Sequence, residues 1–548
     1  MILAVARNRP YEPALNLPGE QEAGPWLFLL PRLDLRRVVV VGRASHGTRV
    51  ALSALGARVE EVSPRSSAGA LQEAADLVYV SFDNAPQLAR DVRAVDALRR
   101  LIRNGSSVYI AGAARGSRAA RTLVRMLGVS ATVELGESPT DAGMPASSDG
   151  PAAWLIPTGA RREAPKAIRA TGRVSRRIRR IRPLAPSESL LAVSRVVAGT
   201  TPPRPGDGVL VHADASAPRQ LPRYVRSAAR RAGCDLDDAI WALAPPRRYR
   251  SQKVVFHLSE RGELVKITQD PRFNHALRAE YDALVALRGW GESHPGAAPR
   301  PLFAGEHAGL LVIGESRLEG EPFRRRSDGT ATCPVAHATI DTLLELAGAE
   351  AREFPGAEVA AALAELHERY VRVLEPPVAH SRLIEEQIGL IGASGSTFRT
   401  AFSHGDPTTH NVLVDPKGRI GLIDWENAER FGMPIWDLLR FLSAYAAWSA
   451  QLGGRRWSVS LACATLFEPS PFHGLLARSI QRYRSTTELG EELVPPLVLT
   501  WLMVEALRQA TRLPLGASTT SHAARLLARI AAHGGHSGLL ALARPRAQ

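Results

Sequence analysis

The chain has 548 residues, of which 45% are hydrophobic and 22% are charged. These fractions match ordinary globular proteins and exclude a disordered, collagen-like or coiled-coil chain. No apolar run reaches the roughly 18 residues that a membrane helix needs, and the N-terminus lacks the basic and apolar regions of a secretory signal. The three cysteines are widely spaced and provide neither a disulfide framework nor a zinc site. We therefore expect a cytoplasmic protein with buried, reduced thiols.

The net charge of +15 is concentrated in one segment. Arg161–Arg182 contains nine arginines, one lysine and one glutamate, so it alone carries +9. Val174, Ile178 and Ile181 recur at helical spacing, which predicts a short amphipathic helix. Two interpretations stay open. The helix is either solvated and docked between two domains, or it contacts an anionic membrane surface or a lipid-linked substrate. Nucleic acid is not expected, because no known binding fold or aromatic interleaving accompanies the charge.

Short apolar runs alternate with amphipathic segments at the start of the chain. They predict strands over residues 36–42, 57–62, 75–82 and 106–113, with helices over residues 45–56 and 86–105. Strands that alternate with helices form a parallel, doubly wound sheet. We therefore expect an α/β, Rossmann-like domain over residues 1–155.

This strand–helix order weakly resembles class I SAM-dependent methyltransferases. Members of that family have a Gly-rich turn after the first strand, whereas this turn contains only Gly42 and Gly47. They also have an acidic residue at the end of the second strand, where this chain has Ser63, with Glu60 and Glu61 slightly earlier. We therefore expect a degenerate domain that acts as a scaffold or recognition module. SAM is not expected as a cofactor.

The remaining chain divides into a connector and a second domain. Residues 156–245 contain the basic segment and a Pro-rich stretch, and are expected to link the two domains. From residue 246 to 548 the pattern is hairpin, helix, hairpin, and then mostly helix. This order predicts an α+β domain.

The segment Ser403–Phe441 carries the most informative pattern. Two short strands, Val412–Val414 and Ile420–Asp424, are joined by the turn sequence Asp-Pro-Lys-Gly. Asp406 and Asn411 precede the first strand, and Asp424 ends the second. Because a hairpin returns its two ends to the same place, these three polar side chains are expected to converge.

Phosphoryl transfer requires such a set, because its loose transition state is stabilised by positioning and charge neutralisation. Mg²⁺ takes oxygen ligands, which Asn411 and Asp424 supply. Asp406 is then left to accept a hydrogen bond from the attacking hydroxyl. Lys266, one of only four lysines in the chain, lies in a predicted strand and offers a cation for nucleotide phosphates. Glu280 lies on the helix that follows and could pair with it.

These residues resemble the aminoglycoside phosphotransferase/choline kinase superfamily, relatives of protein kinases. His404, Gly405, Asp406 and Asn411 match the HGD-x4-N motif, and the later motif positions match Asp424 and Asp437. The resemblance covers roughly residue 250 to the C-terminus and implies a bilobal, protein-kinase-like fold.

The resemblance also implies roles for individual residues. Asp406 would be the catalytic base, Asn411 and Asp424 the Mg²⁺ ligands, and Lys266 the ATP-phosphate ligand with Glu280 as its partner. The segment Leu310–Gly320 resembles the strand and hinge whose backbone holds adenine, at Glu315 and Ser316. The remaining motif positions have structural interpretations: a buried scaffold role for His404, hydrogen bonding for Asp437, and core packing for Trp425 and Trp436.

Three functions remain open from the sequence. The first is an ATP- and Mg²⁺-dependent kinase acting on a hydroxyl of a small molecule or glycan. The second is a bifunctional methyltransferase–kinase that modifies a saccharide, and the third is a pseudokinase scaffold. In the resembling superfamily the C-terminal helices usually form the acceptor site. Residues 451–548 contain eleven arginines and five glutamates, so we expect a neutral or anionic acceptor, not a polycationic aminoglycoside.

Overall fold

A computed structural model describes the chain from residue 27 to residue 532 with gaps. The described parts are residues 27–111, 123–137 and 221–258, each with short gaps, the strands 153–157, 192–195 and 208–212, and residues 260–393, 397–512 and 521–532. The chain forms two compact units. The first along the chain contains Leu17–Arg278 and Pro301–Arg317, and the second contains Ala279–Arg300 and Leu318–Gln548.

The first unit begins with a parallel sheet of four strands, in the spatial order β2-β1-β3-β4. Their bounds are β1 Arg37–Val41, β2 Arg58–Val62, β3 Leu77–Val80 and β4 Ser107–Ala111. All four were predicted as strands, and their parallel pairing is confirmed. Strand β1 is flanked by β2 on one side and β3 on the other. The chain therefore adds its second strand on one side of β1 and its third strand on the other side.

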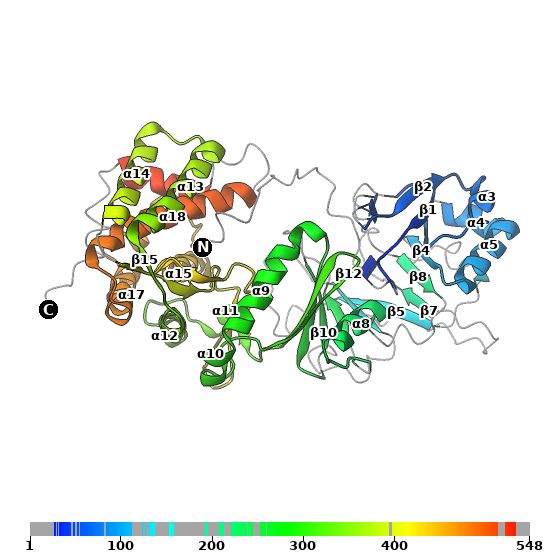
Figure 1. Cartoon of the computed structure of the whole chain (residues 1–548), viewed down its shortest axis with the longest axis horizontal. Coiled ribbons are helices and arrows are strands. Elements are labelled where there is room, and N and C mark those ends of the chain that lie inside the picture. Colours follow the sequence, from blue (N-terminus) through cyan, green and yellow to red (C-terminus); the bar gives the residue numbers. More distant parts are fainter. Residues whose placement is uncertain are drawn as a thin grey trace. The chain divides into compact units, whose positions relative to one another are not determined.

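The apolar side chains of β1 alternate between the two faces of the sheet. Val39 and Val41 share a buried cluster with Leu98 and Leu101 of a covering helix, whereas Val38 belongs to the cluster on the other face. The covering helices are α3 (Ser67–Ala70), α4 (Ala85–Arg90) and α5 (Val92–Arg103). Figure 1 shows α4 and α5 on the same side of these strands.

The prediction of a single helix over residues 86–105 is wrong in one respect, because the structure has two helices there. Asp91 separates them with an extended backbone (φ −92°, ψ 98°). Its carboxylate accepts hydrogen bonds from the backbone N–H groups of Arg93 and Ala94, and so caps the start of α5. The amphipathic pattern continues across the break, which explains why periodicity alone did not detect it.

The sheet continues beyond β4 into one sheet of thirteen strands, within the first unit. Strand β8 (Gly208–His212) pairs antiparallel with β4, and β10 (Lys253–Leu258) pairs antiparallel with β11 (Glu263–Thr268). The other strands are β5 Ala131–Glu137, β6 Ala153–Pro157, β7 Ala192–Arg195, β9 Ala242–Ala244, β12 Pro301–His307 and β13 Leu310–Ser316, and one helix, α8, spans Arg223–Arg231. The expected boundaries at residues 155 and 245 therefore do not coincide with the division between the two compact units, and they stay predictions.

The second unit is mostly helical, as predicted for the end of the chain. Helix α9 (Asn274–Ala286) leads into it. Its helices are α10 Arg288–Ser293, α11 Phe323–Arg326, α12 Pro334–Ala349, α13 Gly356–Leu374, α14 Val378–Ala393, α15 Trp436–Leu452, α16 Val459–Leu466, α17 Pro471–Thr487, α18 Val494–Arg512 and α19 His522–Ala532. Its strands are β14 Glu321–Pro322, β15 Glu353–Pro355, β16 Thr397–Arg399, β17 Ala401–Ser403, β18 Val412–Val414, β19 Ile420–Leu422 and β20 Glu429–Gly432.

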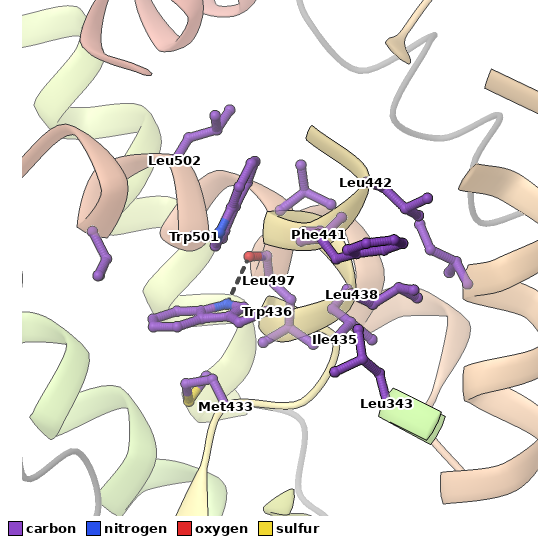
Figure 2. Close-up of a cluster of buried hydrophobic side chains, with 14 of the residues drawn as sticks. Leu343, Met433, Ile435, Trp436, Leu438, Phe441, Leu442, Leu497, Trp501 and Leu502 are labelled. Atoms are coloured by element: carbon purple, nitrogen blue, oxygen red, sulfur yellow. Dashed lines mark hydrogen bonds between the residues drawn. The ribbon is translucent and has the colours of Figure 1, made fainter. Parts of the chain in front are cut away.

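The core of the second unit is an apolar cluster around α15 (Figure 2). Trp436 lies at the start of this helix and donates a hydrogen bond from Nε1 to the carbonyl oxygen of Leu497, at 3.1 Å. The bond satisfies the polar atom of a buried indole. Trp425 is also fully buried, so the prediction that Trp425 and Trp436 belong to the core is confirmed.

Two further expectations can be compared with the described residues, and two others fall wholly or largely outside them. Cys333 and Cys463 are buried as expected, but Cys234 is only partly buried. No helix in the described ranges is both long and apolar enough to cross a bilayer. The predicted amphipathic helix in Arg161–Arg182 lies outside the described residues, as does much of the helix expected over residues 45–56.

Candidate active site

The predicted hairpin is confirmed and positions the site residues. Strands β18 and β19 pair antiparallel, with Val412 opposite Leu422 and Val414 opposite Ile420. In the turn, the carboxylate of Asp415 accepts hydrogen bonds from the backbone N–H groups of Lys417 and Arg419, each at 2.8 Å. The loop that contains Asp406 and Asn411 therefore enters the hairpin where Asp424 leaves it.

The loop before the hairpin is held by Asp437, at the first turn of α15. The two oxygens of its carboxylate accept hydrogen bonds from the backbone N–H groups of His404, at 2.6 Å, and Gly405, at 3.0 Å. The backbone of Gly405 is left-handed (φ +75°), and a Cβ there would lie 1.9 Å from the carbonyl oxygen of Asn427. Asp437 therefore has the predicted hydrogen-bonding role, and the site requires glycine at position 405.

His404 is a buried scaffold residue, as predicted. Its Nε2 lies 3.0 Å from the carbonyl oxygen of Ile423, and its Nδ1 accepts a hydrogen bond from the backbone N–H of Asp406. This pattern requires the neutral tautomer with its proton on Nε2. Burial lowers the pKa of His404, and the carboxylates of Asp437, Asp406 and Asp424 offset only part of that effect. The ring therefore fixes the backbone next to Asp406 and stays uncharged.

Two arginines also hold the loop that contains Gly405. Arg440 of α15 and Arg508 of α18 both donate to the carbonyl oxygen of Gly405. Arg440 also pairs with Glu505 of α18. Burial acts to lower the pKa of Arg440, but Glu505, Asp406 and Asp437 outweigh it and raise the pKa overall. These bonds tie the loop to two helices that are far apart in the sequence.

The three predicted polar residues meet as expected. Asn411 donates from Nδ2 to the backbone oxygen of Asp406 at 3.0 Å, and more weakly to its carboxylate oxygen Oδ2 at 3.4 Å. The amide oxygen of Asn411 takes no part in these two bonds. Asp424 has a left-handed backbone (φ +71°), a conformation that non-glycine residues rarely adopt and that is often found at functional sites. Directly after it, the backbone N–H of Trp425 donates to Glu280 at 3.2 Å.

All three residues line one pocket of about 420 Å³ in the second unit. This volume lies within the range of about 300–1,000 Å³ that is typical of small-molecule sites. The remaining lining residues come from α11, the loop before β18 and one face of α15: Arg324, Thr408, Thr409, His410, Ala444, Ala447, Trp448 and Gln451.

Sequence reasoning missed Arg324, which contributes a cation to this pocket. It is half-buried and donates from Nε to the hydroxyl of Thr409 at 2.9 Å. Arg325 and Arg326, its neighbours on α11, are exposed. The three consecutive arginines look alike in the sequence, and only the packing of α11 distinguishes the first.

The predicted nucleotide residues of the first unit lie on neighbouring strands. Lys266 is buried on β11 and forms a 2.6 Å ion pair with Glu315, which is buried on β13. The strands pair antiparallel with Lys266 opposite Ile313, so Glu315, two residues further along, lies on the same face of the sheet. Ser316 ends β13. From the sequence we predicted only a backbone role for Glu315 and did not predict its ion pair with Lys266. The predicted pairing of Lys266 with Glu280 stays a prediction.

A second polar pocket, of about 440 Å³, lies at the carboxyl ends of β1, β2 and β3. Its lining includes Gly42, Glu61 and Ser63. The two acidic residues near the end of β2 form ion pairs with arginines. Glu60 pairs with Arg37, and Glu61 pairs with Arg49. The two carboxylates are therefore already engaged in ion pairs.

The segment that contains the motif is similar to a known protein family. Residues 243–461 match the family model described as the phosphotransferase enzyme family. The expected resemblance to a phosphotransferase family is therefore confirmed for this region. No curated protein matches the sequence.

Several solved structures are similar to part of the chain. An aminoglycoside phosphotransferase from Streptomyces rimosus is 16% identical over 49% of this chain and 92% of its own, with a TM-score of 0.31. A glucosamine kinase bound to glucosamine, ADP and inorganic phosphate is 14% identical over 55% and 91%, with a TM-score of 0.36. A choline kinase from Streptococcus pneumoniae is 15% identical over 52% and 90%, with a TM-score of 0.32. At these identities and TM-scores, the superpositions do not establish activity or substrate.

Proposed function

We propose that this protein is an ATP- and Mg²⁺-dependent phosphotransferase that acts on a hydroxyl group of a small molecule or glycan. The observation that carries the proposal is the convergence of Asp406, Asn411 and Asp424 in one small-molecule-sized pocket. Phosphoryl transfer depends on positioned carboxylates and cations more than on covalent chemistry by the protein.

The donor atoms fit Mg²⁺. Asp424 offers a carboxylate and Asn411 a free amide oxygen, and both are hard oxygen ligands. The described residues contain no group of three or more His, Cys, Asp or Glu side chains arranged for a metal. Protein sites usually hold Mg²⁺ through one or two carboxylates together with substrate phosphates. When bound, the ion neutralises charge on the transferred phosphoryl group.

Asp406 is proposed to accept the hydrogen bond of the acceptor hydroxyl and to orient its oxygen for attack. Its backbone is fixed by His404 and Asn411. A carboxylate held on a rigid backbone presents its oxygens in one direction, and such positioning lowers the entropic part of the barrier.

Lys266 is proposed to bind the nucleotide phosphates, with Glu280 as its partner in the nucleotide complex. The backbone of Glu315 and Ser316 is proposed to hold the adenine. The support is that Lys266 is a buried cation held in one orientation by Glu315. An oriented cation of this kind is what the phosphates require.

The direct test is a screen of acceptor pools for products that gain one phosphoryl group from ATP, detected by mass spectrometry. We expect Mg²⁺-dependent phosphorylation of a hydroxylated metabolite or glycan. Thermal shift with Mg·ATP and with SAM separates the alternatives. Stabilisation by ATP alone supports the kinase, stabilisation by both supports a bifunctional enzyme, and a response to neither supports the scaffold.

A change at the metal ligand tests the site independently of the acceptor. Asp424→Ala is expected to lose Mg·ATP binding as well as activity, because a single amide oxygen cannot hold the ion. Calorimetric titration with Mg·ATP measures this. Asp341→Ala removes an exposed carboxylate of α12 that pairs with Arg482 and serves as the control. Equal affinity in both variants would contradict the assignment of Asp424.

The buried lysine provides a second test. Lys266→Arg keeps the charge but changes its shape and reach, and a guanidinium does not fit the slot in which Nζ meets Glu315. We expect kcat/KM to fall by about 100-fold, the scale seen when one donor to developing charge is lost. Lys417→Arg, in the exposed hairpin turn, is expected to be silent. Equal effects at the two positions would remove the reason for assigning Lys266 to the nucleotide.

A further inference from the structure

The pocket that contains Asp406 also contains a cation that the phosphotransferase chemistry above does not use. Arg324 lies on α11, immediately after β14, and lines the pocket together with Asp406 and Asp424. Its Nε donates to Thr409, in the loop between Asp406 and Asn411. That bond fixes the plane of the guanidinium and leaves its two terminal nitrogens, with four N–H groups, for another partner.

Within the described parts of the chain, no carboxylate lies within ion-pair distance of Arg324, and Nε alone has a hydrogen-bond partner. Arg440, in the same region, pairs with Glu505. The effect on the two pKa values differs accordingly: burial lowers the pKa of Arg324, whereas carboxylates raise that of Arg440. Arginine stays charged in either case, so Arg324 is a partly desolvated positive charge without an ion-pair partner among the described residues.

The residues that α15 contributes to the pocket have a different character. Ala444, Ala447, Trp448 and Gln451 fall at helical spacing on one face of α15. They present small apolar surfaces, an indole edge and an amide. Such a surface accepts a compact ligand of mixed polarity and carries no charge. Beside the carboxylates of Asp406 and Asp424, the arginine in the lining is Arg324.

We propose that Arg324 binds an anionic group, a phosphate or a carboxylate, on the acceptor, and so makes the enzyme specific for acidic hydroxylated substrates. The inference rests on the proposed function and deepens it by naming the substrate class. A guanidinium fixed at Nε presents its remaining N–H groups in the planar fork that suits phosphate and carboxylate oxygens. The excess of arginine over glutamate in residues 451–548 has the sign that attracts such a ligand.

The alternative source of the anion is the terminal phosphate of the nucleotide. We favour the acceptor because Mg²⁺, which Asp424 would help to hold, would itself neutralise nucleotide phosphates in this chemistry. The guanidinium of Arg324 is then available for a second anionic ligand.

The first experiment needs no turnover. Inorganic phosphate is titrated into the wild-type protein, Arg324→Gln and Arg326→Gln at constant ionic strength, without nucleotide or Mg²⁺, and binding is followed by calorimetry. We expect Arg324→Gln to weaken phosphate binding by about ten-fold or more, the effect of losing one charge-assisted pair. Arg326→Gln changes an exposed arginine of the same helix, and should bind within two-fold of wild type. Wild-type affinity in Arg324→Gln would overturn the proposal even if the protein were shown to have no kinase activity.

The second experiment identifies the source of the anion. Steady-state kinetics compare a neutral sugar with its phosphorylated and carboxylated forms. We expect Arg324→Gln to raise KM for the acidic acceptors by about ten-fold or more and to leave KM for ATP unchanged, with partial recovery in Arg324→Lys. A rise in KM for ATP, or an equal fall of kcat for every acceptor, would instead assign Arg324 to the nucleotide and overturn the acceptor proposal. If no acceptor is phosphorylated by the wild type, the proposed function fails. The phosphate titration still decides whether Arg324 binds an anionic group.

Discussion

Asp406→Asn is expected to lower kcat by about 100-fold or more while nucleotide affinity stays near that of the wild type. The magnitude is that of losing a positioned proton acceptor. Asparagine has nearly the same volume and leaves the backbone contacts with His404 and Asn411 in place, so the change removes charge without moving the loop. Single-turnover kinetics and a nucleotide titration measure the two quantities separately.

The matched control for this variant is Asp341→Asn, which removes a carboxylate from an exposed ion pair with Arg482. Exposed pairs contribute little to stability, and this one is not part of the pocket, so its kcat should be that of the wild type. If Asp406→Asn kept most of its kcat, Asp406 would not be the group that orients the acceptor hydroxyl. A loss of nucleotide affinity equal to the loss of kcat would assign it to nucleotide or metal binding.

Gly405→Ala is the second change with a large expected effect. The added methyl group would lie 1.9 Å from the carbonyl oxygen of Asn427, and the backbone at residue 405 is left-handed. The left-handed conformation costs a non-glycine residue about 1–2 kcal/mol, and overpacking costs about 1–3 kcal/mol more. We therefore expect a loss of about 2–5 kcal/mol in the free energy of unfolding, measured by urea denaturation, together with loss of activity from displacement of Asp406.

Gly418→Ala separates the two contributions. Gly418 also has a left-handed backbone (φ +82°), but an added methyl group there would meet nothing within 4 Å. It should therefore show the conformational cost alone, about 1–2 kcal/mol, and keep its activity. If the two variants were equally stable, the contact between residue 405 and Asn427 would not constrain the loop.

The sequence predicted the local parts of the site because they depend on neighbouring residues. The turn at Asp415 and the apolar strands on either side are sufficient to specify the hairpin. The hairpin in turn brings the loop containing Asp406 next to Asp424. In the first unit, four short apolar runs predicted four parallel strands in the same way.

The sequence did not predict features that depend on contacts between distant segments. The break at Asp91 lies within a continuous amphipathic pattern, and only the backbone geometry reveals it. The ion pair of Lys266 with Glu315 results from the register of β11 on β13. A pattern within one segment cannot specify that register.

The sequence alone determined the chemistry available to this protein: two carboxylates and an amide around a hairpin, in an arrangement that resembles a phosphotransferase family. The tertiary structure decided how these groups are held and what surrounds them. Asp437, Arg440 and Arg508 clamp the loop of Asp406 from helices that lie beyond it in the chain. The packing of α11 turns one of three consecutive arginines into the pocket. The physical reason is that residue type and local spacing fix which groups can act, whereas burial and long-range hydrogen bonds fix their direction and their charge environment.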